Sequence, residues 1–220
     1  MVASKKDALK EENVEALKQG VENLQKHIET IQAFNLPYVV AVNHFVHDTD
    51  AEHKALAEWL EENNHPYALS KVWADGGEGA VDLANKVLEQ IDQNTQKFTR
   101  LYENEQSIEE KIEAIATKVY GAKTVNYSKK ARNQLRKFKR EGWDNLQVCM
   151  AKTQMSLSDD PKRYGRPRDF ELTIRELTPS IGAGFIVALT GEMMTMPGLP
   201  KRPAAMDMDV DEDGNAKGLF

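Results

Sequence analysis

Two aromatic residues stand where a ligand pocket in an α/β protein would need them. Phe45 and Trp73 each come at the carboxyl end of a run, 36–42 and 67–73, that predicts a strand. Neighbouring parallel strands lie about 4.8 Å apart, and ligands of open α/β sheets bind outside the carboxyl ends of the strands. Two rings at this edge could form a slot for a flat heterocycle. Ordinary core packing is the alternative, because most Phe and Trp side chains serve it.

A glycine-rich segment, 76–79, follows Trp73 and precedes a predicted helix. Glycines let backbone N–H groups approach an anion at a helix N-terminus. However, the sequence contains neither G-x-G-x-x-G nor G-x-x-x-x-G-K-[ST], the patterns that bind dinucleotides and triphosphates. A tight turn from strand to helix is therefore the favoured interpretation.

Two further segments carry groups that suit a binding site. Lys152, Thr153 and Gln154 follow a predicted strand, where a cation and hydrogen-bonding groups can hold a phosphate or carboxylate. Residues 191–200 hold two prolines and two glycines, which predicts a rigid, irregular pocket wall. A surface loop and a plain connecting loop are the respective alternatives, and the pattern does not separate them.

Histidines and acidic residues give two weaker signals for a metal. His44, His47 and His53 are close in sequence but lack cysteine partners and the H-E-x-x-H spacing, so we predict polar surface residues and assign no metal. His44 and His47 do flank the proposed slot, which leaves a binding role open. Residues 209–214 resemble the start of a calcium loop, but the twelfth position is Phe220 instead of a bidentate Glu. We therefore predict a solvated acidic turn.

A basic helix and a single cysteine complete the candidates. Residues 128–140 could grip nucleic acid, but Phe138 is the only aromatic among the basic residues, and a solvated face or a subunit contact is favoured. Cys149 lies inside a predicted strand and is expected to be a small core residue, not a nucleophile. No convincing Ser/His/Asp or Cys/His arrangement is present, so the catalytic residues stay unassigned.

Composition narrows the class of protein further. The 220 residues carry 29 basic and 35 acidic side chains, a net charge of −6, which argues against a general polyanion binder. The single cysteine excludes an intrachain disulfide and indicates a reducing compartment. The first residues lack the apolar core of a signal peptide, and residues 181–190 are too short to span a membrane. We expect a cytoplasmic protein that binds neither nucleic acid nor membrane.

The elements that must position these residues alternate along the chain. Helical spacing and capping residues such as Thr49 and Ser107 predict helices over about 10–34, 49–62, 76–93, 107–120 and 128–140. Apolar runs predict strands over 36–42, 67–73, 146–151, 170–175 and 185–189, the first of them buried on both faces.

This order predicts an α/β fold with βαβ units, a mostly parallel or mixed sheet, flanking helices and a strand-rich C-terminal part. We divide the chain into four segments. They are an amphipathic helix over 1–35, an α/β unit with the aromatic slot over 36–95, a helical segment over 96–145, and a closing part over 146–220. The closing part ends in an irregular acidic tail that we expect on the surface.

Several long segments of the sequence resemble formate–tetrahydrofolate ligase, also called formyltetrahydrofolate synthetase. The resemblance runs from about Asp7 to Phe220, and the matching segments follow one another in the same order as in that family. The most specific segment is 189–201. The other segments are 72–79, 148–161, 173–176, 182–185, 203–205 and 211–220. The family is longer, and the resemblance covers its C-terminal two-fifths only. It implies a fragment, a truncated gene product or one piece of a larger polypeptide.

The resemblance implies a function. Family members join formate to tetrahydrofolate with ATP, through formyl phosphate, and yield 10-formyltetrahydrofolate. In this chain the pterin ring would stack between Phe45 and Trp73, with Leu69 lining the slot. Many members have proline where this chain has Val46, so Val46 is left out of the site. For Lys152, Gln154 and Met196–Pro200 the resemblance implies only a position near the cleft.

It also implies cofactors and partners. The whole enzyme would use ATP and magnesium, and a monovalent cation could also take part. None of these groups is assigned to residues of this chain. The substrates would be tetrahydrofolate, formate and ATP, and the partners an N-terminal portion that holds the phosphate loop and further copies in a homo-oligomer, a tetramer in the family. Without that portion we predict no activity. A non-catalytic α/β folate-binding or subunit-assembly module is the alternative.

Overall fold

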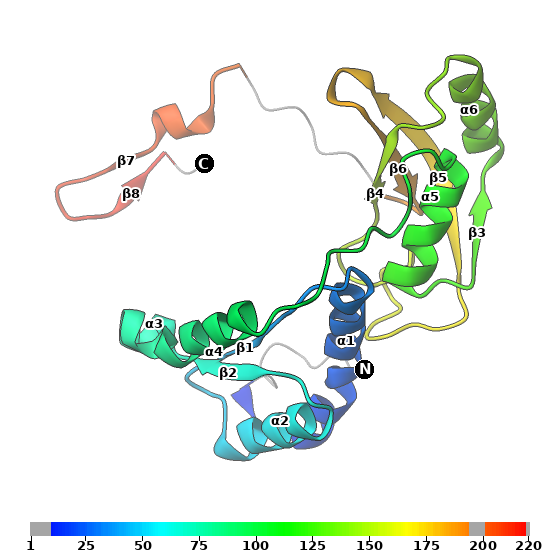
Figure 1. The fold of residues 1–220 in the computed structure, drawn as a ribbon. Coiled ribbons are helices and arrows are strands. Elements are labelled where there is room, and N and C mark those ends of the chain that lie inside the picture. The colour runs from blue at the N-terminus through cyan, green and yellow to red at the C-terminus, as the bar shows by residue number, and fades with distance from the viewer. Residues whose placement is uncertain (1–9, 194–200, 219–220) are drawn as a thin grey trace.

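The computed structural model describes residues 10–193 and 201–218. Within them the chain forms a mixed α/β structure with two separate sheets and a short terminal hairpin (Figure 1). The predicted fold class is confirmed. Among these residues no helix combines the length and the apolar character that crossing a membrane requires.

The first sheet belongs to a βαβ unit. Strand β1 (Val40–Asn43) pairs in parallel with β2 (Tyr67–Ser70), and helix α2 (Asp50–Glu62) makes the crossover. The predicted cap at Thr49 is confirmed, because Thr49 and Glu52 form a reciprocal capping box. After β2 come the short helix α3 (Val72–Asp75), a 3₁₀ turn (Gly76–Ala80) and helix α4 (Val81–Asp92).

Three predictions about this unit are wrong in detail. The second strand stops at Ser70 instead of Trp73, because the chain turns at Lys71 into α3. The next helix begins at Val81 instead of Gly76, after the 3₁₀ turn. The first strand starts at Val40 and alternates between half-buried and exposed side chains. It is not buried on both faces, because the side chains of Ala41 and Asn43 are exposed on one of them.

The second sheet has four strands in the order β3-β5-β6-β4. Its members are β3 (Thr124–Tyr127), β4 (Gln147–Ala151), β5 (Glu171–Ser180) and β6 (Phe185–Thr190). The outer pairs β3–β5 and β4–β6 are parallel, and the central pair β5–β6 is antiparallel. Strand β3 falls within the segment predicted to be helical, where only four residues, flanked by Lys123 and Ser128, carry the strand pattern.

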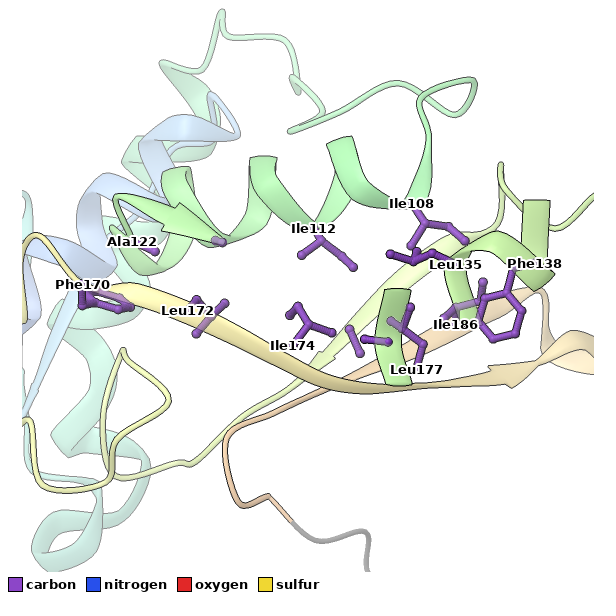
Figure 2. Close-up of a cluster of buried hydrophobic side chains, with 13 residues drawn as sticks. Ile108, Ile112, Ala122, Leu135, Phe138, Phe170, Leu172, Ile174, Leu177 and Ile186 are labelled. Atoms are coloured by element: carbon purple, nitrogen blue, oxygen red, sulfur yellow. The ribbon is translucent and has the colours of Figure 1, made fainter. Parts of the chain in front are cut away.

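The main hydrophobic core lies between this sheet and its helices. Helix α5 (Ile108–Ala114), its π-helical continuation (Ile115–Tyr120) and α6 (Lys129–Arg140) pack their apolar faces on the strands. Figure 2 shows Ile108 and Ile112 of α5 facing the side chains of β5. Ser107 caps α5 as predicted, and Ser128 caps α6. The buried cluster contains Ile108, Ile112, Ala116, Ala122, Ala131, Leu135, Phe138, Phe170, Leu172, Ile174, Leu177, Ile186 and Ala188.

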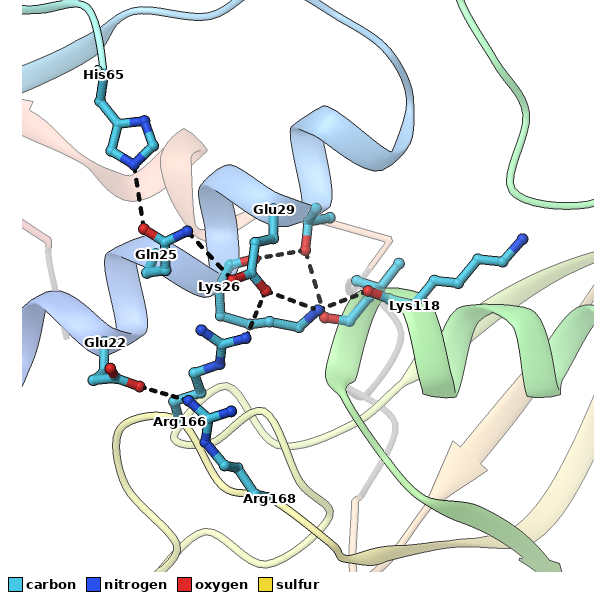
Figure 3. A network of polar contacts seen from close by, with 10 residues as sticks. Glu22, Gln25, Lys26, Glu29, His65, Lys118, Arg166 and Arg168 are labelled. Carbon is cyan, nitrogen blue, oxygen red and sulfur yellow. Dashed lines mark hydrogen bonds and ion pairs between the residues drawn. The ribbon is translucent and has the colours of Figure 1, made fainter. Parts of the chain in front are cut away.

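Helix α1 (Val14–Ala33) lies between the two sheets and bonds to both parts (Figure 1). In Figure 3 the Lys26 ammonium donates to the carbonyl of Lys118 over 2.7 Å, and Arg166 pairs with Glu29 at 2.6 Å. On the other side, His65 bonds to Gln25 at 3.2 Å. Burial lowers the pKa of Lys26. The amphipathic helix predicted for the first segment thus joins the βαβ unit to the four-stranded sheet.

The acidic tail is more regular than predicted. Strands β7 (Asp209–Val210) and β8 (Ala216–Lys217) form a small exposed antiparallel hairpin. Its turn uses Asp211, whose Oδ1 accepts from the backbone N–H groups of Asp213 and Asn215. That carboxylate therefore serves the turn, in agreement with the predicted solvated acidic turn. Phe220 lies outside the described residues.

Candidate functional site

The carboxyl ends of β1 and β2 meet at one edge of the first sheet. Asn43 lies opposite Ser70 in the parallel register, and the N–H of His44 extends the ladder by donating to the carbonyl of Ser70 over 3.0 Å. The loop after β1 and helix α3 after β2 therefore start side by side. These two segments carry Phe45 and Trp73.

Phe45 projects from a tight turn into solvent. Its N–H donates to Oδ2 of Asp48 over 2.8 Å, and the N–H of Asp48 donates back to the carbonyl of Phe45 over 3.0 Å. The turn holds the Phe45 side chain 63% exposed. Core packing, the alternative for this residue, is therefore wrong, and the ring is free to contact a ligand.

Trp73 is more exposed still, at 85%. It lies on α3, and that helix is anchored at Lys71, whose N–H donates to the carbonyl of Gly79 over 2.9 Å. The carbonyl of Lys71 in turn accepts from the N–H groups of Ala74 and Asp75. The alternative of core packing is therefore wrong for Trp73 as well.

Leu69 lies half-buried, one position before the end of β2. Its side chain lines an apolar hollow of about 230 Å³ between the first sheet and α2, whose other lining residues are Val42, His53, Lys54, Ala57 and Tyr67. The structure thus brings Phe45 and Trp73 to one sheet edge and places Leu69 in the hollow behind it.

The glycine-rich segment serves as a turn. An ideal Cβ on Gly79 would lie 2.6 Å from the carbonyl carbon and oxygen of Lys71, so a side chain does not fit there. Gly76 has a φ of +59°, which favours glycine. Together they reverse the chain between α3 and α4, in agreement with the interpretation favoured from the sequence.

The ammonium group of Lys152 forms hydrogen bonds within its own loop. Its ammonium donates to the carbonyls of Thr153 and Ser156 and lies 5.2 Å from the centre of the Tyr120 ring. Burial lowers the pKa of this side chain. Gln154 is exposed. The ammonium group of Lys152 is therefore committed to loop carbonyls.

The segment that follows β4 lies close to the first residues of the segment 191–200. Residues Thr153, Asp159, Asp160, Pro161, Lys162, Gly191, Glu192 and Met193 line a cavity of about 640 Å³. Gly191 fits closely there, because a Cβ on it would lie 2.7 Å from the carbonyl oxygen of Asp159. The lining has three carboxylates and one ammonium, so it does not suit an anion. Met196–Pro200 lies outside the described residues.

The basic helix and Cys149 both belong to the unit of the second sheet. Helix α6 buries Ala131, Leu135 and Phe138 against the second sheet and turns its charged side to solvent. Cys149 is exposed, so the prediction of a core position is wrong. It lies on the edge strand β4, where Val148 and Met150 face the core instead.

Sequence reasoning missed one cluster at the aromatic edge. The side chains of His44, Asp48 and His53 converge, with their nearest ligand atoms within 4.8 Å of one another. His47, from the same loop, is exposed and not part of the group. A spacing of four and five residues matches no familiar metal motif, and only the fold of the loop onto α2 brings the three together.

A family model agrees with the resemblance seen in the sequence. The model described as formate–tetrahydrofolate ligase matches residues 2–220 of the 220-residue chain. The match includes the βαβ unit with its aromatic edge and the four-stranded sheet with its loops. The chain therefore belongs to the formate–tetrahydrofolate ligase family.

Proposed function

We propose that this chain supplies the tetrahydrofolate-binding part of an ATP-dependent ligase that makes 10-formyltetrahydrofolate from formate and tetrahydrofolate through formyl phosphate. One observation carries the proposal within the family: two large aromatic side chains, Phe45 and Trp73, are held exposed at the same carboxyl edge of a parallel sheet. Open α/β sheets bind their ligands at this edge.

Stacking gives these exposed rings a function. Covering an apolar ring that is exposed to water lowers the free energy of the system. A flat heterocycle covers a ring face without needing a matching side-chain shape. A pterin has such a face, and its attached groups extend away from the stack. Phe45 and Trp73 would bind and orient the ring, and Leu69 would extend the apolar surface behind it. Holding the folate amine toward an activated formyl group lowers the entropic part of the barrier.

The sequence of this chain offers no familiar pattern for binding a triphosphate. No G-x-x-x-x-G-K-[ST] pattern occurs in the sequence, and Gly79 is followed by Ala80 and Val81, without lysine or hydroxyl. The glycine turn is closely packed against Lys71. We therefore assign ATP, magnesium and formate activation to an N-terminal portion like that of the family, together with any monovalent cation. We also expect the homo-oligomer typical of the family.

Steady-state kinetics on the chain joined to an N-terminal portion of a family member tests the assignment. Trp73→Ala and Phe45→Ala are expected to raise KM for tetrahydrofolate and leave KM for ATP and formate unchanged. Val46→Ala is the matched control, because Val46 is 70% exposed in the same loop and is not assigned to the pocket. An equal effect of all three substitutions on all three KM values would contradict the assignment. Folate binding without turnover would favour the non-catalytic module.

A further inference from the structure

Three side chains at the aromatic edge form a group that folate stacking does not use. His44 follows β1 directly, Asp48 lies in the loop, and His53 lies in the first turn of α2. Their side chains are 26%, 33% and 22% exposed, respectively. They are thus partly sheltered and still open to an ion from solvent.

The distances between their ligand atoms match those around a metal ion. Nδ1 of His44 lies 3.3 Å from Nε2 of His53, which lies 3.5 Å from Oδ2 of Asp48. The third side of the triangle, from Nδ1 of His44 to Oδ2 of Asp48, is 4.0 Å. Tetrahedral ligands bonded at about 2.1 Å lie about 3.4 Å apart. The two separations from Nε2 of His53 are close to this value, and the third is about 0.6 Å longer.

The backbone holds each of these residues in place. The N–H of Phe45 donates to the same Oδ2 of Asp48 over 2.8 Å, and so fixes the carboxylate. The N–H of His44 is bonded to Ser70, and the N–H of His53 is bonded to the carbonyl of Thr49 over 3.0 Å. A hydrogen bond to a ligating carboxylate, such as the one that Asp48 accepts, orients the ligand and raises metal affinity. The carboxylate and the backbone that carries the two imidazoles are therefore fixed before an ion binds.

We propose that His44, Asp48 and His53 bind one divalent transition-metal ion of the zinc type. Two imidazole nitrogens and one carboxylate oxygen suit Zn²⁺, Co²⁺ or Ni²⁺, whereas Mg²⁺ and Ca²⁺ prefer oxygen ligands alone. Three protein ligands leave a fourth position for water. A bound ion would tie the loop to the first turn of α2.

The site has a consequence for Phe45, which lies between two of the ligands in sequence. An ion held by His44 and Asp48 would restrict the turn that presents the Phe45 ring. This consequence rests on the proposed folate function, but ion binding does not. Metal titration without folate therefore tests the site independently of the proposed function.

The experiment titrates the chelator-treated 220-residue chain with Co²⁺ and Zn²⁺. We expect one equivalent of Co²⁺ to give the visible absorption of a four-coordinate ion, and Zn²⁺ to displace it. His53→Gln and Asp48→Asn should each weaken binding at least about tenfold, since even supporting residues cost that much when removed. His47→Gln is the matched control, a histidine of the same loop outside the cluster, and should bind as the parent does. Circular dichroism checks that each variant folds.

Two results would overturn the proposal. One is the absence of saturable Co²⁺ and Zn²⁺ binding by the folded parent chain. The other is binding by His53→Gln and Asp48→Asn that is no weaker than that of the control His47→Gln. Either pattern would leave the group as a hydrogen-bonded His–Asp–His cluster.

Discussion

Exposed aromatic rings at the edge of the first sheet contrast, at the scale of residues, with a buried ammonium group in the core of this chain. Phe45 and Trp73 project into solvent from segments fixed by backbone hydrogen bonds. Lys111, by contrast, is fully buried and donates to three carbonyls, those of Asn104, Asn145 and Leu146. A lysine so placed stabilises the fold and is not available to a phosphate.

Lys111→Met should lower the free energy of unfolding by at least about 2 kcal/mol, because three buried carbonyls would lose their charged donor. Burial lowers the pKa of Lys111, and the charges of Asp144 and Glu105 act in the opposite direction. Chemical denaturation measures the difference. Lys123→Met, at an exposed position, is the control and should stay within about 0.5 kcal/mol of the parent. Equal stabilities for the two variants would refute the role assigned to Lys111.

At the scale of elements, helix starts marked by a capping residue were predicted well, and strand ends were predicted poorly. Thr49 and Ser107 cap helices where the sequence places them, because capping depends on neighbours within three residues. The end of β2 depends instead on the contact of Lys71 with Gly79, eight positions away. Strand β3 also depends on pairing across the sheet, because a pattern of four residues is too short to predict a strand.

The same distinction applies to the candidate site. The position of Phe45 and Trp73 at one sheet edge was predictable, because the carboxyl ends of parallel strands share an edge. The partly sheltered group of His44, Asp48 and His53 was not, since it depends on how the loop folds back onto α2. Nor was the exposure of Cys149, because an apolar strand pattern does not tell which face an edge strand leaves open.

Gly79→Ala should destabilise the segment that carries Trp73. Its Cβ would meet the backbone of Lys71 at 2.6 Å, so α3 must shift. We expect a loss of about 1–3 kcal/mol in the free energy of unfolding, typical of overpacking, and a changed Trp73 environment. Gly77→Ala is the matched control, because nothing lies within 4 Å of its Cβ. Denaturation curves that coincide for the two variants would contradict the close packing of this turn.

On the scale of the whole molecule, α1 connects the two sheets through a few polar contacts. Lys26 and Glu29 face the C-terminal part, and Gln25 faces the βαβ unit (Figure 3). The aromatic edge and the second sheet thus belong to one connected structure. Neither part contains the sequence pattern of a phosphate loop.

The purified 220-residue chain should make no 10-formyltetrahydrofolate from ATP, formate, magnesium and tetrahydrofolate. Phosphoryl transfer needs a cradle of N–H groups, a lysine and a metal site. Addition of the family's N-terminal portion should restore turnover if the two associate. Product detection by absorbance after acid conversion is the assay, with the N-terminal portion alone as the control. ATP-dependent product from the chain by itself would reveal a nucleotide site within these residues.

Calorimetric titration of the intact chain with tetrahydrofolate tests the central claim most directly. The account predicts saturable binding that Trp73→Ala and Phe45→Ala each weaken by about 1–3 kcal/mol, the usual effect of removing a stacked aromatic. Val46→Ala, altered in the same loop, should bind with the affinity of the parent. Absence of saturable binding, or equal affinities of the parent, Trp73→Ala and Phe45→Ala, would contradict the claim that these rings hold the folate.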